Sequence, residues 1–328
     1  MWLYERRQIS DHRVLQLTEK NSIMCVIPGS KEDVAAHQVI DAVSRQLRSG
    51  SGTPEAFFRR AVAHKQTFHL QAAVDDFDVV IDRMNRHDAA VGRSHFFRGI
   101  CHRRLGRLDE AIDDGNAAVA LRPDDPGVFT IRGFALANVG RLDDAEHDFE
   151  TALRLDPGHT LAKIYQGFNR FAAADYRGAL QMYDDAMAMS DRLSFGPYLN
   201  RGITRLVVGD RTGAWADIRV AAELRTKIRI IAVDPRPNAY LALLHYLDGD
   251  LAAAHEQVQV SQHIGPDPMA SLLHGLLEAR HGEKSELRNL LQQMVAWHPQ
   301  GMVCGTRDAA RFMSDPVSII PLLQPLTR

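Results

Sequence analysis

The feature that most constrains this sequence is a segment that nearly repeats itself thirty-four residues later. Residues 106–125 read GRLDEAIDDGNAAVALRPDD and residues 140–159 read GRLDDAEHDFETALRLDPGH, with nine of twenty positions identical. The identical positions include a glycine, two alanines, two leucines and a proline. A fixed period of this length indicates stacked copies of one supersecondary unit, because a single small unit cannot bury its own apolar face.

The same pattern continues in both directions along the chain. Each copy has a glycine or alanine, a second small residue twelve positions later, and small or aromatic residues four and seven positions after that. The first small residue recurs seven times, 33 to 40 residues apart, at Ala61, Gly99, Gly133, Gly167, Gly202, Ala242 and Gly275. The outer copies depart from the pattern: Leu287 takes the second small position of the last copy, and Asp191 and Thr226 stand where a closing proline is expected.

These residues resemble the tetratricopeptide repeat, a helix–turn–helix unit of thirty-four residues. The resemblance covers about three quarters of the chain and implies an all-α, right-handed superhelical solenoid of about seven helix pairs. Helices approach closely only where small side chains meet, so we predict that Gly133 lies against Ala145. Pro123 and Pro157 lack a backbone donor, and we expect each to follow the end of a second helix.

The chain outside the repeats divides into two flanks. Residues 1–52 are predicted to be an N-terminal extension with one amphipathic helix over residues 31–47 (KEDVAAHQVIDAVSRQL), and the array occupies residues 53–300. Residues 301–328 are predicted to form a capping helix and an apolar tail. The tail could cover the last unit, as solenoids need for solubility, or dock into a groove; we favour the cap.

Composition argues against several classes of function. The formal net charge is −2, so no overall positive charge favours nucleic acid or an anionic membrane. Cys25, Cys101 and Cys304 lie far apart, which predicts reduced thiols rather than a disulfide framework. No apolar stretch is long enough to span a membrane, and the segment SIMCVI is too short for a signal peptide, so we predict a cytoplasmic protein.

No residue pattern predicts catalysis, a cofactor or a metal. The sequence lacks HExxH, GxSxG, P-loop and GxGxxG motifs. His64, His102 and His245 recur where the family usually has tyrosine, so we interpret them as structural, and the seven-residue spacing of His95 and His102 does not suit a helical metal site. Adjacent acids recur in the second helices and are interpreted as a solvated outer face; they are Asp75 and Asp76, Asp113 and Asp114, Asp143 and Asp144, and Asp184 and Asp185. We predict a non-enzyme.

The resemblance also implies that the first helix of each unit lines a concave groove, into which repeat positions 2, 5, 9, 12 and 13 face. Positions 5 and 9 contain neither lysine nor asparagine, which excludes the mode in which family members clamp a chaperone's acidic C-terminus. The predicted partner-binding residues are Phe96, Ile100, Phe134, Ile164, Phe168, Phe171 and Ile203, with Arg93, Arg103 and Arg104 as a basic end. Two interpretations stay open: superhelical winding buries the apolar stripe as ordinary core, or the stripe receives an apolar or amphipathic segment of a partner.

We therefore predict a scaffold, adaptor or chaperone-like holder whose partner is a protein or peptide. Fold alone does not determine function, so two alternatives stay open. One is a regulator that senses a small peptide or ligand inside the superhelix. The other is a structural protein, a homo-oligomer that assembles through residues 316–328.

Overall fold

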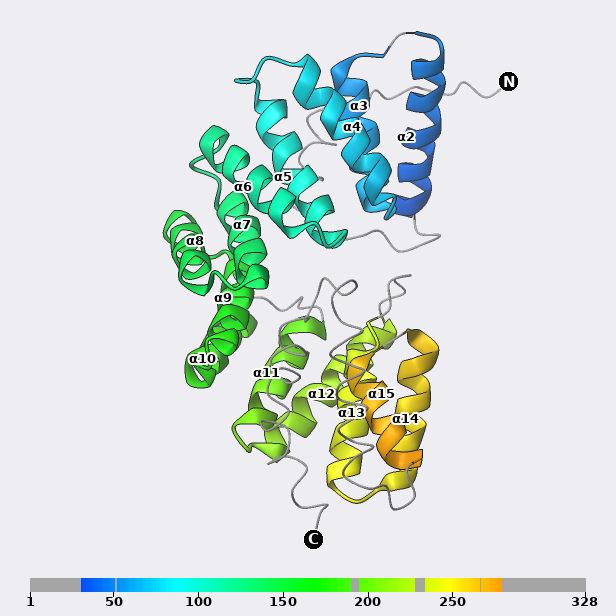
Figure 1. The fold of residues 1–328 in the computed structure, drawn as a ribbon, viewed down its shortest axis with the longest axis vertical. Coiled ribbons are helices and arrows are strands. Elements are labelled where there is room, and N and C mark those ends of the chain that lie inside the picture. Colours follow the sequence, from blue (N-terminus) through cyan, green and yellow to red (C-terminus); the bar gives the residue numbers. More distant parts are fainter. Residues whose placement is uncertain (1–30, 51, 190–194, 228–233, 266, 279–328) are drawn as a thin grey trace, which may run out of the picture.

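The computed structural model describes residues 31–50, 52–189, 195–227, 234–265 and 267–278. Within these ranges the chain forms fourteen helices and no strand. α2 (Lys31–Arg48) comes first, and the helices after it alternate as first and second members of successive antiparallel pairs (Figure 1). The predicted all-α solenoid and the predicted N-terminal helix are both confirmed.

Six helix pairs are described in full. They are α3 (Pro54–Gln66) with α4 (Leu70–Arg83), α5 (Ala89–Arg104) with α6 (Leu108–Leu121), α7 (Pro126–Val139) with α8 (Leu142–Leu155), α9 (Thr160–Ala172) with α10 (Tyr176–Ala188), α11 (Phe195–Val207) with α12 (Arg211–Lys227), and α13 (Arg236–Leu247) with α14 (Leu251–Ile264). α15 (Pro268–Glu278) begins a seventh unit. The rest of that unit, the predicted capping helix and tail, and residues 1–30 lie outside the described residues.

Local sequence signals set the helix ends. The side chain of Asp125 accepts a hydrogen bond from the backbone N–H of Gly127 at 2.8 Å, and Pro126 takes the first helical position, where a missing N–H costs nothing. Gly140 ends α7 with φ +94°, a left-handed conformation that glycine adopts without a steric penalty. α6 and α8 each end two residues before the expected prolines, as predicted.

The two helices of a pair approach at their small residues. A Cβ added to Gly133 would lie 2.9 Å from the Phe149 ring and 3.2 Å from the carbonyl oxygen of Ala145, so the predicted Gly133–Ala145 contact is confirmed. The same crowding occurs at Gly167 against Tyr183 and at Gly202 against Ile218. Only a residue without a side chain lets the second helix pack at this distance.

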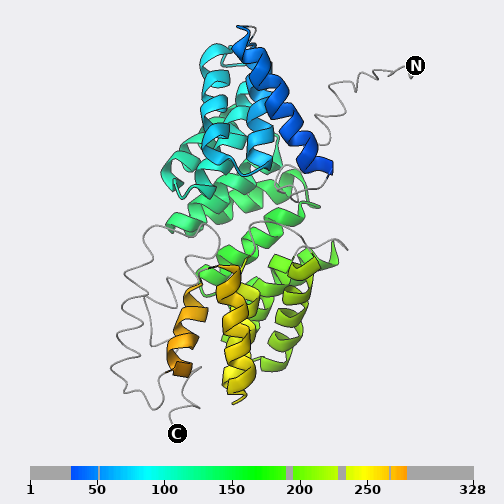
Figure 2. The same ribbon diagram turned by 90° about the vertical axis from the view of Figure 1, so that its right-hand side faces the viewer.

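Units stack mainly through the second helix of one unit and the first helix of the next, as α4 packs against α5 and α6 against α7. First helices of neighbouring units also meet one another. α3 packs against α5, α5 against α7, α7 against α9 and α9 against α11, whereas no contact of this extent joins successive second helices in the described chain. The first helices therefore line the inner side of the array and the second helices its outer side. Figures 1 and 2 show the pairs following one another from α2 at one end to α14 and α15 at the other.

A buried ion pair recurs in four of the units. An arginine of the first helix donates two hydrogen bonds, from Nε and Nη2, to an aspartate sixteen residues later in the second helix, and the Nη2–Oδ1 distances are 2.6 to 2.7 Å. The pairs are Arg60–Asp76, Arg98–Asp114, Arg132–Asp148 and Arg201–Asp217. Bidentate pairing of this kind fixes orientation as well as distance.

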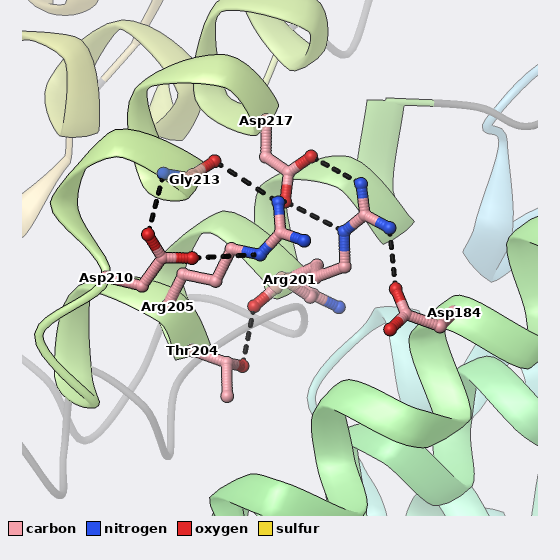
Figure 3. A network of polar contacts seen from close by, with 8 residues as sticks. Asp184, Arg201, Thr204, Arg205, Asp210, Gly213 and Asp217 are labelled. Carbon is pink, nitrogen blue, oxygen red and sulfur yellow. Dashed lines mark hydrogen bonds and ion pairs between the residues drawn. The ribbon is translucent and has the colours of Figure 1, made fainter.

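The Nη1 group of each of these arginines also reaches the helix that precedes its own unit. Its partners there are Ser44 in α2, Asp78 in α4, Asn116 in α6 and Asp184 in α10. Figure 3 shows Arg201 between Asp217 and Asp184, with Arg205 donating to Asp217 as well. One side chain therefore joins both helices of its own unit to the unit before it.

These pairs correct the interpretation of the adjacent acids. Asp76 and Asp114 are buried, each in an ion pair with an arginine, and do not belong to a solvated face. Their neighbours Asp75 and Asp113 are exposed, as predicted. Adjacent residues of a helix differ in direction by about 100°, so one acid of a doublet can point at the first helix while the other points at water.

We expect Gly133→Leu to lower the free energy of unfolding by roughly 1–3 kcal/mol or more, because the new side chain would overlap the Phe149 ring and the backbone of α8. Gly265→Leu is the matched control, since no atom of a described residue beyond its chain neighbours lies within 4 Å of its Cβ position. Urea titration of both variants measures the difference, and equal stability of the two would contradict the close approach.

We expect Asp217→Ala to cost about 3–5 kcal/mol, because it leaves the charges of Arg201 and Arg205 without their buried acceptor. Arg201 also pairs with Asp184, and the Asp184 side chain is 52% exposed, whereas that of Asp217 is 4% exposed. Asp184→Ala should therefore cost less than about 1 kcal/mol. Chemical denaturation measures the unfolding free energy of both variants. Similar losses of stability would show that the buried pair contributes no more than the exposed one.

Candidate protein-binding surface

Most of the predicted partner-binding residues are buried between helices. Only Arg93, Arg104 and Ile164 are half-exposed. The seven buried ones are Phe96, Ile100, Arg103, Phe134, Phe168, Phe171 and Ile203. The structure thus favours the first of the two open interpretations for the apolar stripe, and direct contact of these seven with a partner stays a prediction.

Cations and aromatic rings alternate where the first helices of units 1 to 3 meet. Three contacts join neighbouring first helices across repeats: Lys65 Nζ lies 4.7 Å from the centroid of Phe97, Arg93 Cζ 5.2 Å from Phe58, and Arg103 Cζ 4.8 Å from Phe134. We call these six residues the inner seam. A cation above an aromatic face is attracted by the ring quadrupole, by as much as about 2 kcal/mol when both are desolvated.

The three arginines predicted as one basic end do not form a single cluster. Arg93 lies at the start of the second turn of α5, and Arg103 and Arg104 lie in its last turn, about 15 Å further along the axis. Arg104 stacks on Phe68 in the loop of unit 1, whereas Arg103 stacks on Phe134 of unit 3. The cations are therefore spread along the inner seam of units 1 to 3.

The chemistry of the inner face changes along the array. The twelfth position of successive repeats holds Lys65, Arg103, Ala137, Phe171, Leu206 and Tyr246. In the middle of the array, Phe134 stacks on Tyr165 with ring centroids 3.9 Å apart and meets Phe168 edge-on at 5.6 Å. Basic side chains thus give way to aromatic and aliphatic ones from the N-terminal to the C-terminal units.

The second unit contains a polar cluster centred on Asp114. His95 Nδ1 lies 2.8 Å from Asp114 Oδ1, His102 Nδ1 lies 3.2 Å from Oδ2, and Arg98 binds both oxygens. Burial raises the pKa of Asp114, but the close contact of His102 and the hydrogen bonds from His95 and Arg98 outweigh it and hold that pKa well below its usual range. Both histidines thus have a structural role, as predicted for His102.

Among the described residues, no group of histidine, cysteine and acidic side chains could hold a metal ion. Arg98 already occupies the coordinating oxygens of Asp114, and a cation in that place would repel a second one. Cys101 is buried, and the other two cysteines lie outside the described residues. No described helix is long and apolar enough to cross a membrane.

We expect Asp114→Asn to flatten the acid limb of the stability profile. A carboxylate whose pKa is depressed in the folded state contributes stability above its unfolded pKa of about 3.9, and that contribution is lost as pH falls toward the folded value. Wild-type unfolding free energy should therefore fall below about pH 4, with a shallower slope in the variant. Asp113→Asn, at the exposed neighbour, should keep the wild-type slope. Urea titrations across pH test this, and identical slopes in both variants would contradict it.

A sequence model described as the tetratricopeptide repeat matches residues 69–126, which span the second helix of unit 1 and the whole of unit 2. A tetratricopeptide repeat protein from Parabacteroides merdae ATCC 43184 has a similar structure, with a TM-score of 0.54 and 15% identity over 85% of this chain and 98% of that one. Residues 69–126 therefore match the tetratricopeptide repeat, and the described chain shares the fold of a tetratricopeptide repeat protein.

Two further structures share this fold. PilW, a type IV pilus biogenesis factor, matches with a TM-score of 0.51 and 17% identity over 66% of this chain and 97% of that one. A chain of the APC/C hetero-tetramer Cut9–Hcn1 matches with a TM-score of 0.56 and 13% identity over 73% of this chain and 46% of that one. No curated protein sequence matches. Tetratricopeptide repeat proteins generally mediate protein–protein interactions and are typically scaffolds rather than enzymes.

The sequence analysis missed the arginine–aspartate pairs and the cation–aromatic contacts. A signal for the first was present, since arginine immediately precedes the first small residue in units 1, 2, 3 and 5, and aspartate follows three residues after the second small residue. Unit 4 has Gln166 at the arginine position and joins unit 3 instead through Glu146, which accepts hydrogen bonds from Gln166, Asn169 and Arg170. The cation–aromatic contacts cross between repeats and have no such periodic signal.

Proposed function

We propose that this chain binds a segment of another protein along the inner face of its array, as a scaffold, adaptor or chaperone-like holder. The observation that supports this is the set of half-exposed apolar side chains at inner-face positions of units 4 to 6. They are Ile164, Val207, Tyr246 and Leu247. Together with the basic units 1 and 2, they make a surface suited to an amphipathic segment.

The energetics favour an extended contact over a single pocket. Each half-exposed side chain loses further apolar surface when a partner covers it, which contributes about 25 cal/mol for each Å² removed from water. The helices that carry these side chains are held in different ways. α9 is held by hydrogen bonds to Glu146 and by the close approach of Gly167 to Tyr183. α11 is held by the Arg201–Asp217 pair, and α13 by a hydrogen bond from Asn238 to Gln257. A surface that is ordered before binding loses less conformational entropy when the partner arrives.

The test compares inner-face and outer-face variants in affinity capture from native cytosol. We expect Ile164→Glu with Tyr246→Glu to reduce recovery of specific partners at least about tenfold, because each change places an unpaired charge where an apolar group should dock. The control is Asp113→Lys with Glu150→Lys, which changes the charge of exposed positions in the second helices and should leave recovery unchanged. Thermal unfolding of both double variants is the control that checks whether each is folded.

Equal recovery of all specific partners by the folded inner-face variant would contradict binding along this face. Loss of recovery in the outer-face variant alone would place the interaction on the second helices instead.

A further inference from the structure

Arg103 differs from the arginines that hold the repeats together. Its side chain is buried, with 3% of the residue exposed, yet Nε and Nη1 have no hydrogen-bond partner, and no ion pair to it is found in the described part of the chain. Arg60, Arg98, Arg132 and Arg201 each donate to a buried aspartate. A buried guanidinium without an acceptor is costly, because it has lost its water and gained no carboxylate.

The ring of Phe134 accounts for only part of the environment of Arg103. The ring lies 4.8 Å from Cζ, and it also stacks on Tyr165, which helps to hold it in place. An aromatic face attracts the charge but accepts no conventional hydrogen bond from Nε or Nη1. The guanidinium is therefore held in position with Nε and Nη1 unbonded and covered, so an acceptor reaches them only by displacing the side chains packed over them.

The buried carboxylates of units 1 to 3 already have cationic partners. Asp114 is occupied by Arg98 and two histidines, Asp148 by Arg132, and Asp76 by Arg60. Glu55, at an inner-face position of unit 1, is exposed and forms no ion pair with another described residue. Among the described residues, no carboxylate is paired with Arg103.

The neighbouring charges on the inner seam have the same sign. Lys65 takes the equivalent position one repeat earlier and is 4% exposed, and Arg93 has Nε without a hydrogen-bond partner. A bound segment would thus meet two or three cations over units 1 and 2, then the aromatic and aliphatic side chains of later units. Complementarity requires acids at one end of that segment and apolar residues at the other.

We propose that Arg103 is the carboxylate-binding residue of the inner face and receives an aspartate or glutamate side chain from an acidic, amphipathic segment of a partner protein. The carboxylate oxygens accept hydrogen bonds from the guanidinium, while Phe134 keeps the guanidinium plane fixed. This inference rests on the proposed binding along the inner face and names the chemistry of the partner.

The first test is stability in the free protein. Arg103→Met keeps an unbranched chain against Phe134 and removes the uncompensated charge, so its melting temperature should equal or exceed that of wild type. Arg132→Met is the matched control and should lower the melting temperature by several degrees, because it leaves Asp148 unpaired. If Arg103→Met destabilises as much as Arg132→Met, Arg103 serves the fold and the proposal is wrong.

The second test is binding of two short, blocked peptides measured by titration calorimetry. One carries glutamates at one end and leucines and phenylalanines at the other, and the second has glutamine at each glutamate position. Wild type should bind the glutamate peptide at least about tenfold more tightly, and Arg103→Met should lose this preference. Arg103→Lys, which keeps the charge but not the planar fork, should retain only part of it.

The remaining outcomes each decide the matter. Equal binding of both peptides by wild type would overturn the carboxylate site while leaving inner-face binding intact. Failure of both peptides to bind would also overturn it, whereas inner-face binding itself is judged by partner capture with the Ile164 and Tyr246 variants. Arg103-dependent binding of a single-stranded DNA oligonucleotide, without a preference between the peptides, would replace the acidic segment by a phosphate backbone.

Discussion

The structure depends most on the buried pairing of an arginine in the first helix with an aspartate in the second. In unit 3, Arg132 places two nitrogen atoms on Asp148 and a third on Asn116 of the preceding unit. Burying either charge alone would be costly, so in the four units that have the pair the two helices are most stable when both partners meet in the right register. The same side chain sets the position of one unit against the next.

Close packing supplies the other half of this constraint. The bidentate geometry requires two helices that nearly touch, and the glycines of the first helices, such as Gly133, make that approach possible. Unit 4 has the small residue but lacks the ion pair, and Glu146 of unit 3 replaces it with hydrogen bonds to Gln166 and Asn169. Helix packing is thus common to all the described units, whereas the polar connection varies.

The inner face also has buried arginines, but not all of them are paired with a carboxylate. Arg98 and Arg103 lie on one helix, five residues apart; the first has two aspartates and the second has only an aromatic ring. Most buried cations of this fold have a carboxylate partner, but Arg103 does not. Its unpaired charge lowers the stability of the free protein, and a ligand that supplies an acceptor would restore that free energy. When most residues of a sequence stabilise the fold, a residue that destabilises it locally is expected to have a functional role.

The sequence by itself determined the helix pairs, their phase and their ends, because these follow from short-range rules. Small residues at a fixed period and prolines after second helices act within one or two turns, so Gly133 and Pro157 could be interpreted without coordinates. Only the tertiary structure decided which charges are buried and which apolar residues are covered. Asp113 and Asp114 are the same residue type and differ only in the direction in which α6 points their side chains. Phe134 is buried because Tyr165 and Arg103 cover its ring, and each of them lies thirty-one residues away in the sequence.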